Sequence, residues 1–481
     1  MFIKVTGLVL LLVIASIPLF VHIDVLPFRL WDESRLASNA YEMHRNGNLI
    51  VTYYEGEPEM WNTKPPLVIW MQLLFIKLLG FNELAVRLPS AIAGLLTCFA
   101  LLYFSEKFFK TYLPGAFACL VLVTTNGYVD THAIRTGDYD GPLAFFTTIF
   151  VLAAFLYTES ENKKWLTPLF AGITLAVLTK SVQPLLFTPG IALYFLLRRK
   201  WKLLFTKTFI IGCITAGAIA GAYYIIREIM NEGYMLAVWN NELGGRYFNG
   251  LEENTEGPLY YISRMGGYLF PYWIWVLPFA IAAGLISKDE KIKRFTTFNL
   301  IVTLSYFLFI TISKTKLYWY TVPLFPLLSL QIAVFFYQAF LYLRRINFLN
   351  HYPSFAIGIL CVAFIYPYQK IGRKVYNPQE YTWDDMYPIS EKLQDAFHRK
   401  VSLNNRVIVY KDYDQHLRVY TDAINDRCEI ISFKQPENLS AGDTVIASED
   451  EIYEIIEQQF EYELLEDEDG LKVYAIKDSR K

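Results

Sequence analysis

The chain has 481 residues, of which 54% are hydrophobic and 17% aromatic, and its mean hydropathy is +0.27. Only 19% of the residues are charged, compared with roughly a quarter in a soluble domain, so an ordinary water-soluble globule is excluded. Residues 371–481 hold 14 basic and 24 acidic side chains, whereas the first 370 residues hold 30 basic and 22 acidic ones. The sequence has no dense Lys/Arg stripe, which argues against nucleic-acid binding. It predicts a mildly basic membrane part followed by an acidic soluble part.

The N-terminal run MFIKVTGLVLLLVIASIPLFV carries one Lys before a long apolar stretch and has no convincing small-x-small cleavage site. It is long enough to cross a membrane, so we interpret it as an uncleaved first transmembrane helix. The five cysteines have no paired spacing that would indicate disulfides or a zinc ribbon.

Apolar runs of spanning length recur along the first 370 residues. They predict about eleven transmembrane helices, near residues 5–24, 84–104, 114–131, 141–158, 165–180, 182–197, 207–227, 269–286, 296–312, 320–342 and 353–369. If the spans alternate in direction, the dense Lys/Arg clusters fall on one side of the membrane, which the positive-inside rule assigns to the cytoplasm. The intervening loops and the C-terminal region then lie on the outer side of the membrane.

The first outer loop, residues 25–83, is long and mixed. The stretch SRLASNAYEMHRNG predicts a short amphipathic helix with Leu36, Ala40 and Met43 on its apolar face and Gly47 as its stop. The following run PPLVIWMQLLFIKLLG predicts a second helix that lies in the membrane interface, because polar residues and Lys77 interrupt it. Residues 1–370 are therefore predicted to form one transmembrane domain with interfacial helices in its first loop.

The composition changes from residue 371. Helix-like stretches at 389–400 and 449–459 alternate with β-rich pieces at 406–410, 429–433, 443–448 and 471–476. This pattern predicts a small soluble α/β domain over residues 371–481. We interpret its acidic run EYELLEDEDG as a solvated turn.

Each predicted outer turn carries ionisable residues, which are costly near lipid and often mark a site. The ionisable residues are Asp32, Glu33, Arg35 and Lys64 in the first turn, Arg135, Asp138 and Asp140 in the second, Lys180 in the third, Arg246 and Arg264 in the fourth, and Lys314 and Lys316 in the fifth. Several cations on one face suit a phosphate, and carboxylates on that face suit a base and its partner. Sugar transfer from a polyprenyl-phosphate donor requires this combination, because the departing phosphate needs cations rather than a general acid.

Six motifs in order, WDESR, NTKPPLVIW, FNELAVRLPSAIAGL, RTGDYDGPLAFF, VLTKS and SKTKLYWYTVPLFP, resemble the bacterial membrane glycosyltransferases of fold type C. The resemblance covers roughly residues 1–340 and is strongest to the families that modify lipid A with aminoarabinose or mannosylate proteins. It implies a mainly α, polytopic membrane enzyme with a small C-terminal α/β periplasmic domain. It also implies Asp32 as the catalytic acid, with Glu33 beside it in a catalytic Asp-Glu motif, and Asp140 as the second catalytic acid.

The resemblance further implies that Lys64, Lys180 and Lys316 contact the donor phosphate, with Arg35 as a further candidate. The partners it implies are a polyprenyl-phosphate sugar donor, membrane lipid and an acceptor that is lipid A, a protein or another glycan. The aminoarabinose transferases have a Glu and a His linked to a metal where this chain has Thr63 and the run NTEGPLYY. No cofactor is therefore indicated, although a divalent metal stays open.

Several of these residues have a simpler alternative interpretation. Asp32 could cap the following helix, and Glu33 could simply pair with Arg35 or be solvated. Arg135 could only pair with Asp138, and Lys314 could be a head-group anchor. The aromatic run at 318–320 is typical of an interface belt, and we interpret none of the histidines as a ligand. The alternative function is a transporter or flippase of lipid-linked sugars, which should carry charges near mid-membrane in both halves. A non-catalytic membrane scaffold would leave the repeated outer charges unexplained.

Overall fold

The computed structural model describes residues 2–130, 132–242, 244, 256–381, 388–411, 413–427, 429–468 and 470–480, with the side chains of residues 2–5, 380 and 381 left aside. The first half of the chain consists of α1 (Phe2–Phe20), α2 (Asp32–Asn46), β1 (Tyr53–Tyr54), β2 (Glu57–Pro58), α3 (Leu67–Leu79), α4 (Glu83–Phe109), α5 (Leu113–Val123), α6 (Asn126–Val129), α7 (Asp140–Ser160), α8 (Leu166–Lys180), α9 (Thr188–Leu197), α10 (Lys207–Met230) and α11 (Tyr234–Val238). The rest of the helical part consists of α12 (Tyr260–Arg264), α13 (Leu277–Leu285), α14 (Glu290–Ile312), α15 (Phe325–Leu343), α16 (Asn347–His351) and α17 (Pro353–Tyr376). The C-terminal part contains α18 (Pro388–Phe397), β3 (Arg406–Ile408), α19 (Gln415–Asn425), β4 (Ile431–Phe433), β5 (Thr444–Ala447), α20 (Asp450–Gln459), β6 (Phe460–Glu468) and β7 (Leu471–Ser479).

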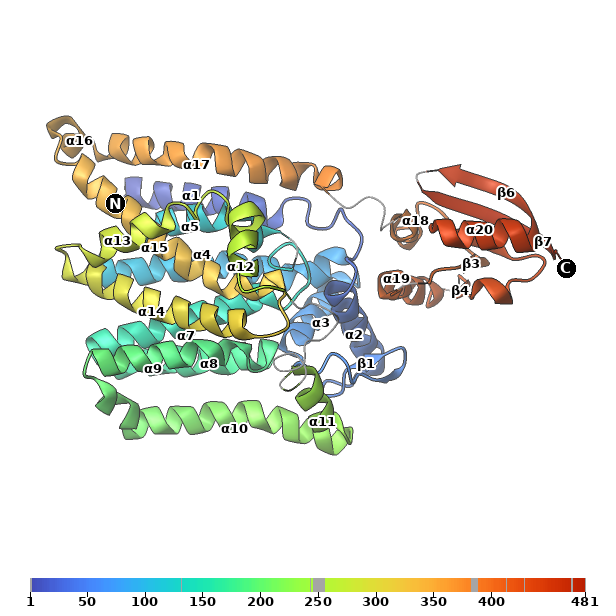
Figure 1. Cartoon of the computed structure of the whole chain (residues 1–481), viewed down its shortest axis with the longest axis horizontal. Coiled ribbons are helices and arrows are strands. Elements are labelled where there is room, and N and C mark those ends of the chain that lie inside the picture. Colours follow the sequence, from blue (N-terminus) through green and yellow to red (C-terminus); the bar gives the residue numbers. More distant parts are fainter. Residues whose placement is uncertain are drawn as a thin grey trace.

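Long apolar helices run side by side along the long axis of the molecule (Figure 1). Within the described residues, six helical stretches are long and apolar enough to cross a membrane: Glu83–Phe109, Asp140–Ser160, Lys207–Met230, Glu290–Ile312, Tyr318–Leu343 and Pro353–Tyr376. Four shorter apolar helices, Thr6–Phe20, Leu67–Leu79, Leu113–Val123 and Gln183–Leu197, accompany them. The chain is thus a multi-pass membrane protein, and the count of eleven spans stays a prediction.

One apolar core holds the bundle together. It joins α1, α4, α5, α7, α8, α9, α14 and α15 through fully buried Leu, Phe and Ala side chains. The helix α10 stands apart at the lower edge of the bundle (Figure 1) and packs mainly on α8. Only 6% of its apolar 18-residue stretch is buried. In a membrane its exposed face would contact lipid rather than water, so its apolar surface carries no penalty.

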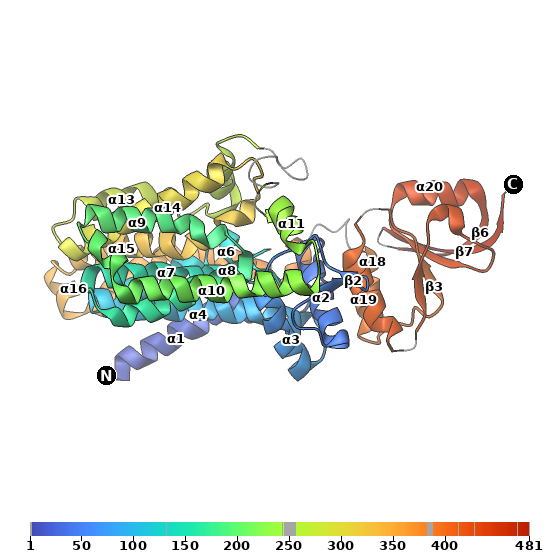
Figure 2. The same ribbon diagram turned by 90° about the horizontal axis from the view of Figure 1, so that it is seen from below.

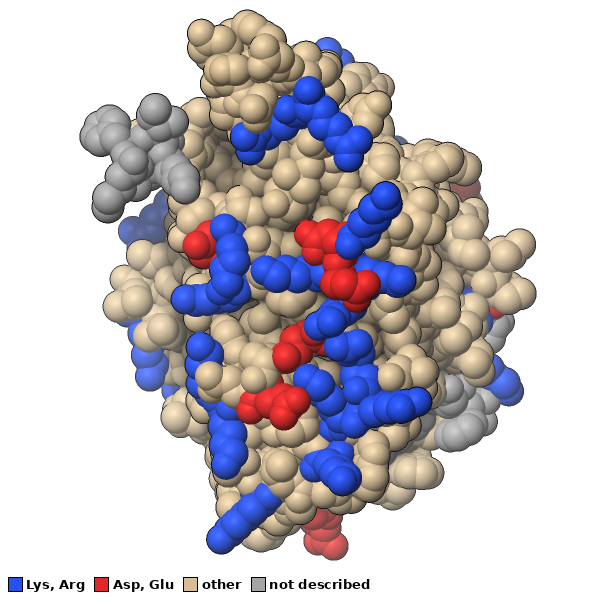
Figure 3. Space-filling view, turned by 90° about the vertical axis from the view of Figure 1, so that its left-hand side faces the viewer, with Lys and Arg blue, Asp and Glu red and all other residues tan. Residues whose placement is uncertain are grey.

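Basic side chains gather at the end of the bundle that faces away from the C-terminal part (Figure 3). A hollow there is lined by Lys107, Lys110, Lys164, Lys291 and Arg294. The positive-inside rule assigns loops with such dense Lys/Arg clusters to the cytoplasm. The first outer loop and the C-terminal part lie at the other end of the bundle (Figures 1 and 2).

The first helix of the first outer loop forms as its pattern predicts. The amphipathic helix α2 buries Leu36, Ala40 and Met43, and it ends at Gly47, whose φ of 72° is the left-handed conformation that glycine adopts most readily. The helix begins at Asp32, which is its first residue, while Trp31 occupies the capping position without a side-chain capping bond. Asp32 is therefore not the helix cap.

The C-terminal part is a five-stranded mixed sheet in the order β4-β3-β5-β7-β6. The strands β4, β3 and β5 are parallel, whereas β7 is antiparallel to both β5 and β6. Successive residues of β3 face opposite sides: Val407 packs in the core beneath α20, and Ile408 packs in the core with α18 and α19. The same core continues into α2 and α3, so the C-terminal part is docked on the first outer loop.

Two features of the C-terminal part differ from the sequence prediction. The acidic run interpreted as a turn is the edge strand β6, whose side chains are mostly exposed and whose register with β7 shifts twice. Charged side chains along an edge strand discourage pairing with other chains. An edge strand can therefore have the acidic composition that is otherwise typical of a solvated turn. The helix α19 was not predicted, although its apolar face of Leu417, Tyr420 and Ile424 has helical spacing.

Candidate functional site

A buried ion pair anchors the start of α2. Glu33 is fully buried, and its Oε1 accepts hydrogen bonds from Arg87 Nε and the Gly137 backbone N–H, each at 2.7 Å. Its Oε2 accepts from Arg87 Nη2 at 2.9 Å and from the Arg29 backbone N–H at 2.8 Å. Burial opposes the charge, but Arg87 and these hydrogen bonds hold the pKa of Glu33 below its usual value. Glu33 therefore joins α2, α4 and the second outer loop.

Gly137 brings the second outer loop against this anchor. A Cβ at this position would lie 2.5 Å from Val86 Cγ1 and 3.0 Å from the Val86 carbonyl oxygen. The backbone can thus approach α4 only because residue 137 has no side chain. Gln72 of α3 completes the contact by donating to the Gly137 carbonyl at 2.9 Å.

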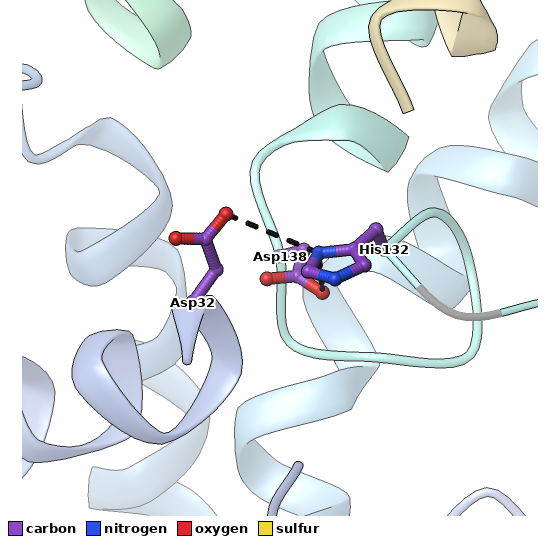
Figure 4. A group of neighbouring side chains, drawn as sticks. All are labelled: Asp32, His132 and Asp138. Carbon is purple, nitrogen blue, oxygen red and sulfur yellow. Dashed lines mark ion pairs between the residues drawn. The ribbon is translucent and has the colours of Figure 1, made fainter. Parts of the chain in front are cut away.

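Asp32, His132 and Asp138 face one another across the gap between α2 and the second outer loop (Figure 4). His132 Nδ1 lies 3.9 Å from Asp32 Oδ2 and 3.5 Å from Asp138 Oδ2, which also accepts a 2.6 Å hydrogen bond from Thr136 Oγ1. The Asp32 side chain is 43% exposed, whereas that of Asp138 is only 3% exposed. His132 has a φ of 63° and stacks on Trp319 with ring centroids 3.9 Å apart.

The electrostatics of this group favour neutral forms of its buried members. Burial lowers the pKa of His132 to about 4, against the opposing pull of Asp32. Burial raises the pKa of Asp138 well above its usual value, and the neighbouring charges of Asp32 and Glu33 raise it further. Asp138 Oδ1 and His132 Nδ1 are buried without a hydrogen-bond partner. A bound cation or a proton would satisfy both atoms.

The donor set therefore fits a divalent cation. Each member of the group Asp32, His132 and Asp138 offers one ligand atom, and these three atoms lie within 4.8 Å of one another. Carboxylate oxygens with one imidazole nitrogen suit metals such as Mn²⁺ or Zn²⁺. A cation held there would supply positive charge beside a phosphate.

A second ion pair borders this group. Asp140, the first residue of α7, accepts from Lys180 Nζ at 2.6 and 2.8 Å, and both side chains are buried. Lys180 Nζ also lies 5.5 Å from the centre of the Tyr320 ring. Asp32 interacts electrostatically with both members of this pair. The structure thus brings Asp32, Asp138, Asp140 and Lys180 together.

Lys64 approaches from the first outer loop. Its Nζ lies 3.2 Å from Glu242 Oε1 and 5.3 Å from the centre of the Tyr139 ring, and its side chain is 10% exposed. Asn62 holds Tyr139 by accepting a hydrogen bond from its hydroxyl at 3.0 Å. Lys64 therefore lies beside the residue that precedes Asp140.

The remaining predicted residues have other partners. Arg35 forms a bidentate salt bridge with the Glu59 carboxylate, with hydrogen bonds of 2.7 and 2.9 Å. Lys316 is buried and donates to the Ser313 carbonyl at 2.7 Å, whereas Lys314 is exposed. Arg135 donates to backbone carbonyls at the end of α1 rather than to Asp138. Arg246, in the fourth outer loop, lies outside the described residues.

Three residues that line the site were not predicted from the sequence. His132 was interpreted as no ligand, and Trp319 and Tyr320 were interpreted as an interface belt. The structure stacks Trp319 on His132 and sets Tyr320 beside Lys180. The position of His132, in the same outer turn as Asp138, was the signal available in the sequence.

Known proteins share this architecture. The structure of ArnT from Cupriavidus metallidurans bound to undecaprenyl phosphate matches with a TM-score of 0.70 at 16% identity, over 98% of this chain and 97% of that chain. The chain has the type C fold of the membrane glycosyltransferases. Residues 63–226 match the family described as dolichyl-phosphate-mannose-protein mannosyltransferase. The resemblance predicted from the sequence is confirmed.

Two curated relatives align with parts of this type C chain. An uncharacterised protein from Aquifex aeolicus (strain VF5) is 24% identical over 63% of this chain, and the alignment spans 58% of that protein. YycA from Bacillus subtilis (strain 168), whose name proposes a mannosyltransferase, is 31% identical over 29% of this chain and 20% of its own length. Both alignments leave a large part of the relative unmatched.

Proposed function

We propose that the chain transfers a sugar from a polyprenyl-phosphate donor to an acceptor at the outer, periplasmic face of a bacterial inner membrane. The observation that carries this proposal is the convergence of Asp32, His132, Asp138 and the Asp140–Lys180 pair in one group. The undecaprenyl phosphate bound by ArnT, whose fold this chain shares, supports a lipid-phosphate donor. The basic face at the opposite end of the bundle supports an outward-facing site, because basic loops face the cytoplasm (Figure 3).

In this proposal Asp32 is the base. It is the most exposed member of the acidic group, so it can reach an incoming hydroxyl. The acceptor oxygen forms a bond to the anomeric carbon while the bond from that carbon to the phosphate oxygen breaks, and Asp32 takes the hydroxyl proton. Attack from the face opposite the phosphate inverts the anomeric configuration. The electron pair of the broken bond leaves with the polyprenyl phosphate.

Lys64 and Lys180 are the cations proposed to hold that phosphate. Each is nearly buried and already paired with a carboxylate, Glu242 or Asp140, at 3.2 and 2.6 Å. Such pairing keeps the ammonium groups in place before the donor arrives. Glu33, which has four hydrogen bonds to protein donors, acts by positioning Asp32 rather than by touching the substrate.

The test is a transfer assay in sealed proteoliposomes. Undecaprenyl-phosphate donors carrying labelled mannose, glucose or aminoarabinose are added outside, together with bacterial membrane extract as the acceptor source. We expect release of undecaprenyl phosphate and label on a new product with inverted configuration by NMR. Labelled donor that crosses the bilayer unchanged would instead establish the transporter alternative.

The Lys64→Gln variant tests the phosphate contact. Loss of one charge-assisted hydrogen bond costs about 1.5–3 kcal/mol, so the KM for the donor should rise roughly 10- to 100-fold. Lys77→Gln is the matched control, because Lys77 is an exposed lysine on the neighbouring helix α3. Equal donor KM values in both variants would remove Lys64 from the site.

A further inference from the structure

The hollow at the basic end of the bundle lies between the ends of three long helices. Its lining comes from the end of α4, the end of α7 and the turn that follows it, and the start of α14. Its volume of about 370 Å³ falls in the range of about 300–1,000 Å³ that is typical of small-molecule pockets. The face that holds it is opposite the first outer loop and the proposed reaction centre (Figures 1 and 3). We call it the basic hollow, because its charged lining consists of Lys107, Lys110, Lys164, Lys291, Arg294 and the single acid Glu159.

The carboxylates at this end of the bundle already have cationic partners or lie outside the hollow. Glu159 accepts hydrogen bonds from Arg198 Nε at 3.2 Å and from Arg294 Nη1 at 3.3 Å, so one carboxylate serves two guanidinium groups. Glu161 pairs with Lys200 at 3.1 Å. The acidic residues that adjoin the lining residues in the chain but do not line the hollow are Glu106, Glu161, Asp289 and Glu290.

The four lysines of the basic hollow form no ion pair within the described residues. Lys107 Nζ lies 5.2 Å from the centre of the Tyr103 ring, and Lys164 Nζ lies 5.1 Å from the centre of the Trp165 ring. Lys291 and Arg294 are three residues apart on α14 and therefore lie on one face of that helix. Ammonium groups gathered around one cavity attract an anion, and a phosphate oxygen can accept a charge-assisted hydrogen bond from each of them.

An apolar stripe on α4 leads to the basic hollow. Leu96, Phe99 and Tyr103 are 41%, 45% and 53% exposed, and Lys107 continues their spacing of three or four residues. In a membrane such a stripe contacts acyl chains. The Tyr103 ring meets the ring of Trp165, which lines the hollow, edge to face at 6.3 Å. Aromatic pairs of this kind mark the boundary between lipid and water, so the hollow lies at the depth of the lipid head groups.

We propose that the basic hollow binds the phosphate head group of an anionic phospholipid. The lipid comes from the leaflet at this end of the bundle, which the positive-inside rule makes the cytoplasmic one. Lys107, Lys164 and Lys291 contact the phosphate, and the acyl chains lie along Leu96 and Phe99. A choline head group is disfavoured, because its own positive charge faces the lysines. The lipid is held rather than consumed, and it links the ends of α4, α7 and α14.

Binding is measured by native mass spectrometry of the full-length protein in a non-ionic detergent. Phosphatidylglycerol and phosphatidylcholine with the same acyl chains are titrated separately, and the dissociation constant of the first bound lipid is compared. We expect phosphatidylglycerol to bind at least tenfold more tightly. The double variant Lys164→Gln/Lys291→Gln should weaken phosphatidylglycerol binding at least tenfold and leave phosphatidylcholine binding unchanged.

The matched control is Lys163→Gln/Lys293→Gln. It removes the same number of exposed charges from the same two segments, but neither lysine lines the hollow. This control should bind phosphatidylglycerol like the wild type. Equal loss in both double variants would show a general effect of surface charge and overturn the proposal, as would wild-type affinity in Lys164→Gln/Lys291→Gln.

Two further measurements complete the test. Inorganic phosphate that displaces phosphatidylglycerol at an equal concentration would make this a free-phosphate site and overturn its assignment to a lipid. The unfolding midpoints of the two double variants without lipid should equal that of the wild type. If Lys164→Gln/Lys291→Gln is less stable, the single variants Lys164→Gln and Lys291→Gln replace it, and wild-type affinity in both would overturn the proposal. The readout is binding alone, so the result does not depend on the proposed function.

Discussion

Replacing Glu33 by Gln tests whether this residue positions Asp32 or takes part in the chemistry. The carboxylate accepts four hydrogen bonds, two on each oxygen, from Arg87, Arg29 and Gly137. A Gln amide would keep one acceptor oxygen and turn an NH₂ group toward N–H donors. It would also leave the buried Arg87 guanidinium, 2% exposed, without its counter-charge.

Breaking a buried ion pair of this kind costs about 3–5 kcal/mol. A loss of this size lowers the unfolding midpoint on the order of 10 °C. By contrast, the Asp32 side chain is 43% exposed, so Asp32→Asn should change stability by less than about 1 kcal/mol. The two variants should therefore differ in stability. Glu33→Gln loses stability together with activity, whereas Asp32→Asn loses activity alone.

Intrinsic-fluorescence thermal unfolding of the purified variants in one detergent measures this difference. Asp24→Asn, which changes an exposed acid just after α1, serves as the control and should match the wild type. A Glu33→Gln protein as stable as the wild type would refute the anchoring role. An Asp32→Asn protein that unfolds as early as Glu33→Gln would refute the assignment of Asp32 to chemistry rather than to folding.

Three further predictions follow from the site and its surroundings. Gly137→Ala should destabilise the second outer loop and reduce transfer, because a Cβ there meets α4 at 2.5 Å; wild-type rates would contradict this close approach. Metal-free protein should bind Mn²⁺ by calorimetry, and Asp138→Asn should weaken that binding at least tenfold if the three-residue group holds a cation; unchanged affinity would exclude it. The hydrogen bond to Glu83 raises the pKa of His398, so its stabilisation is complete below about pH 6.5 and is lost as the pH rises through the folded value. The unfolding midpoint should then fall as the pH rises above about 6.5 in the wild type but not in His398→Gln, and equal pH profiles would show that this contact does not matter.

Local patterns predicted much of the fold. The spacing of Leu36, Ala40 and Met43 and the stop at Gly47 predicted α2, because one apolar face and a left-handed terminus are properties of a single segment. The apolar runs predicted most of the long helices within a few residues. The strand β6 was missed because its charges lie on an edge, where alternation with apolar residues is weak.

The site was harder to predict, since it depends on contacts between distant segments. The acids at 32, 138 and 140 stood out because acids near lipid are costly, and the structure brings them together with Lys180. Glu33 was assigned to catalysis because it adjoins Asp32, yet its partner Arg87 lies 54 residues away. The stacking of His132 on Trp319 joins residues that are far apart in the chain, which one sequence cannot reveal.

The central claim is that Asp32 is the base. The most direct test compares the rate of sugar transfer by Asp32→Asn with the rates of the wild type and Asp24→Asn. Loss of a general base slows transfer about 10²- to 10⁴-fold. We predict a fall of this size in turnover at saturating donor, with donor affinity and the unfolding midpoint unchanged. An Asp32→Asn protein that turns over donor within tenfold of the wild type would contradict the account.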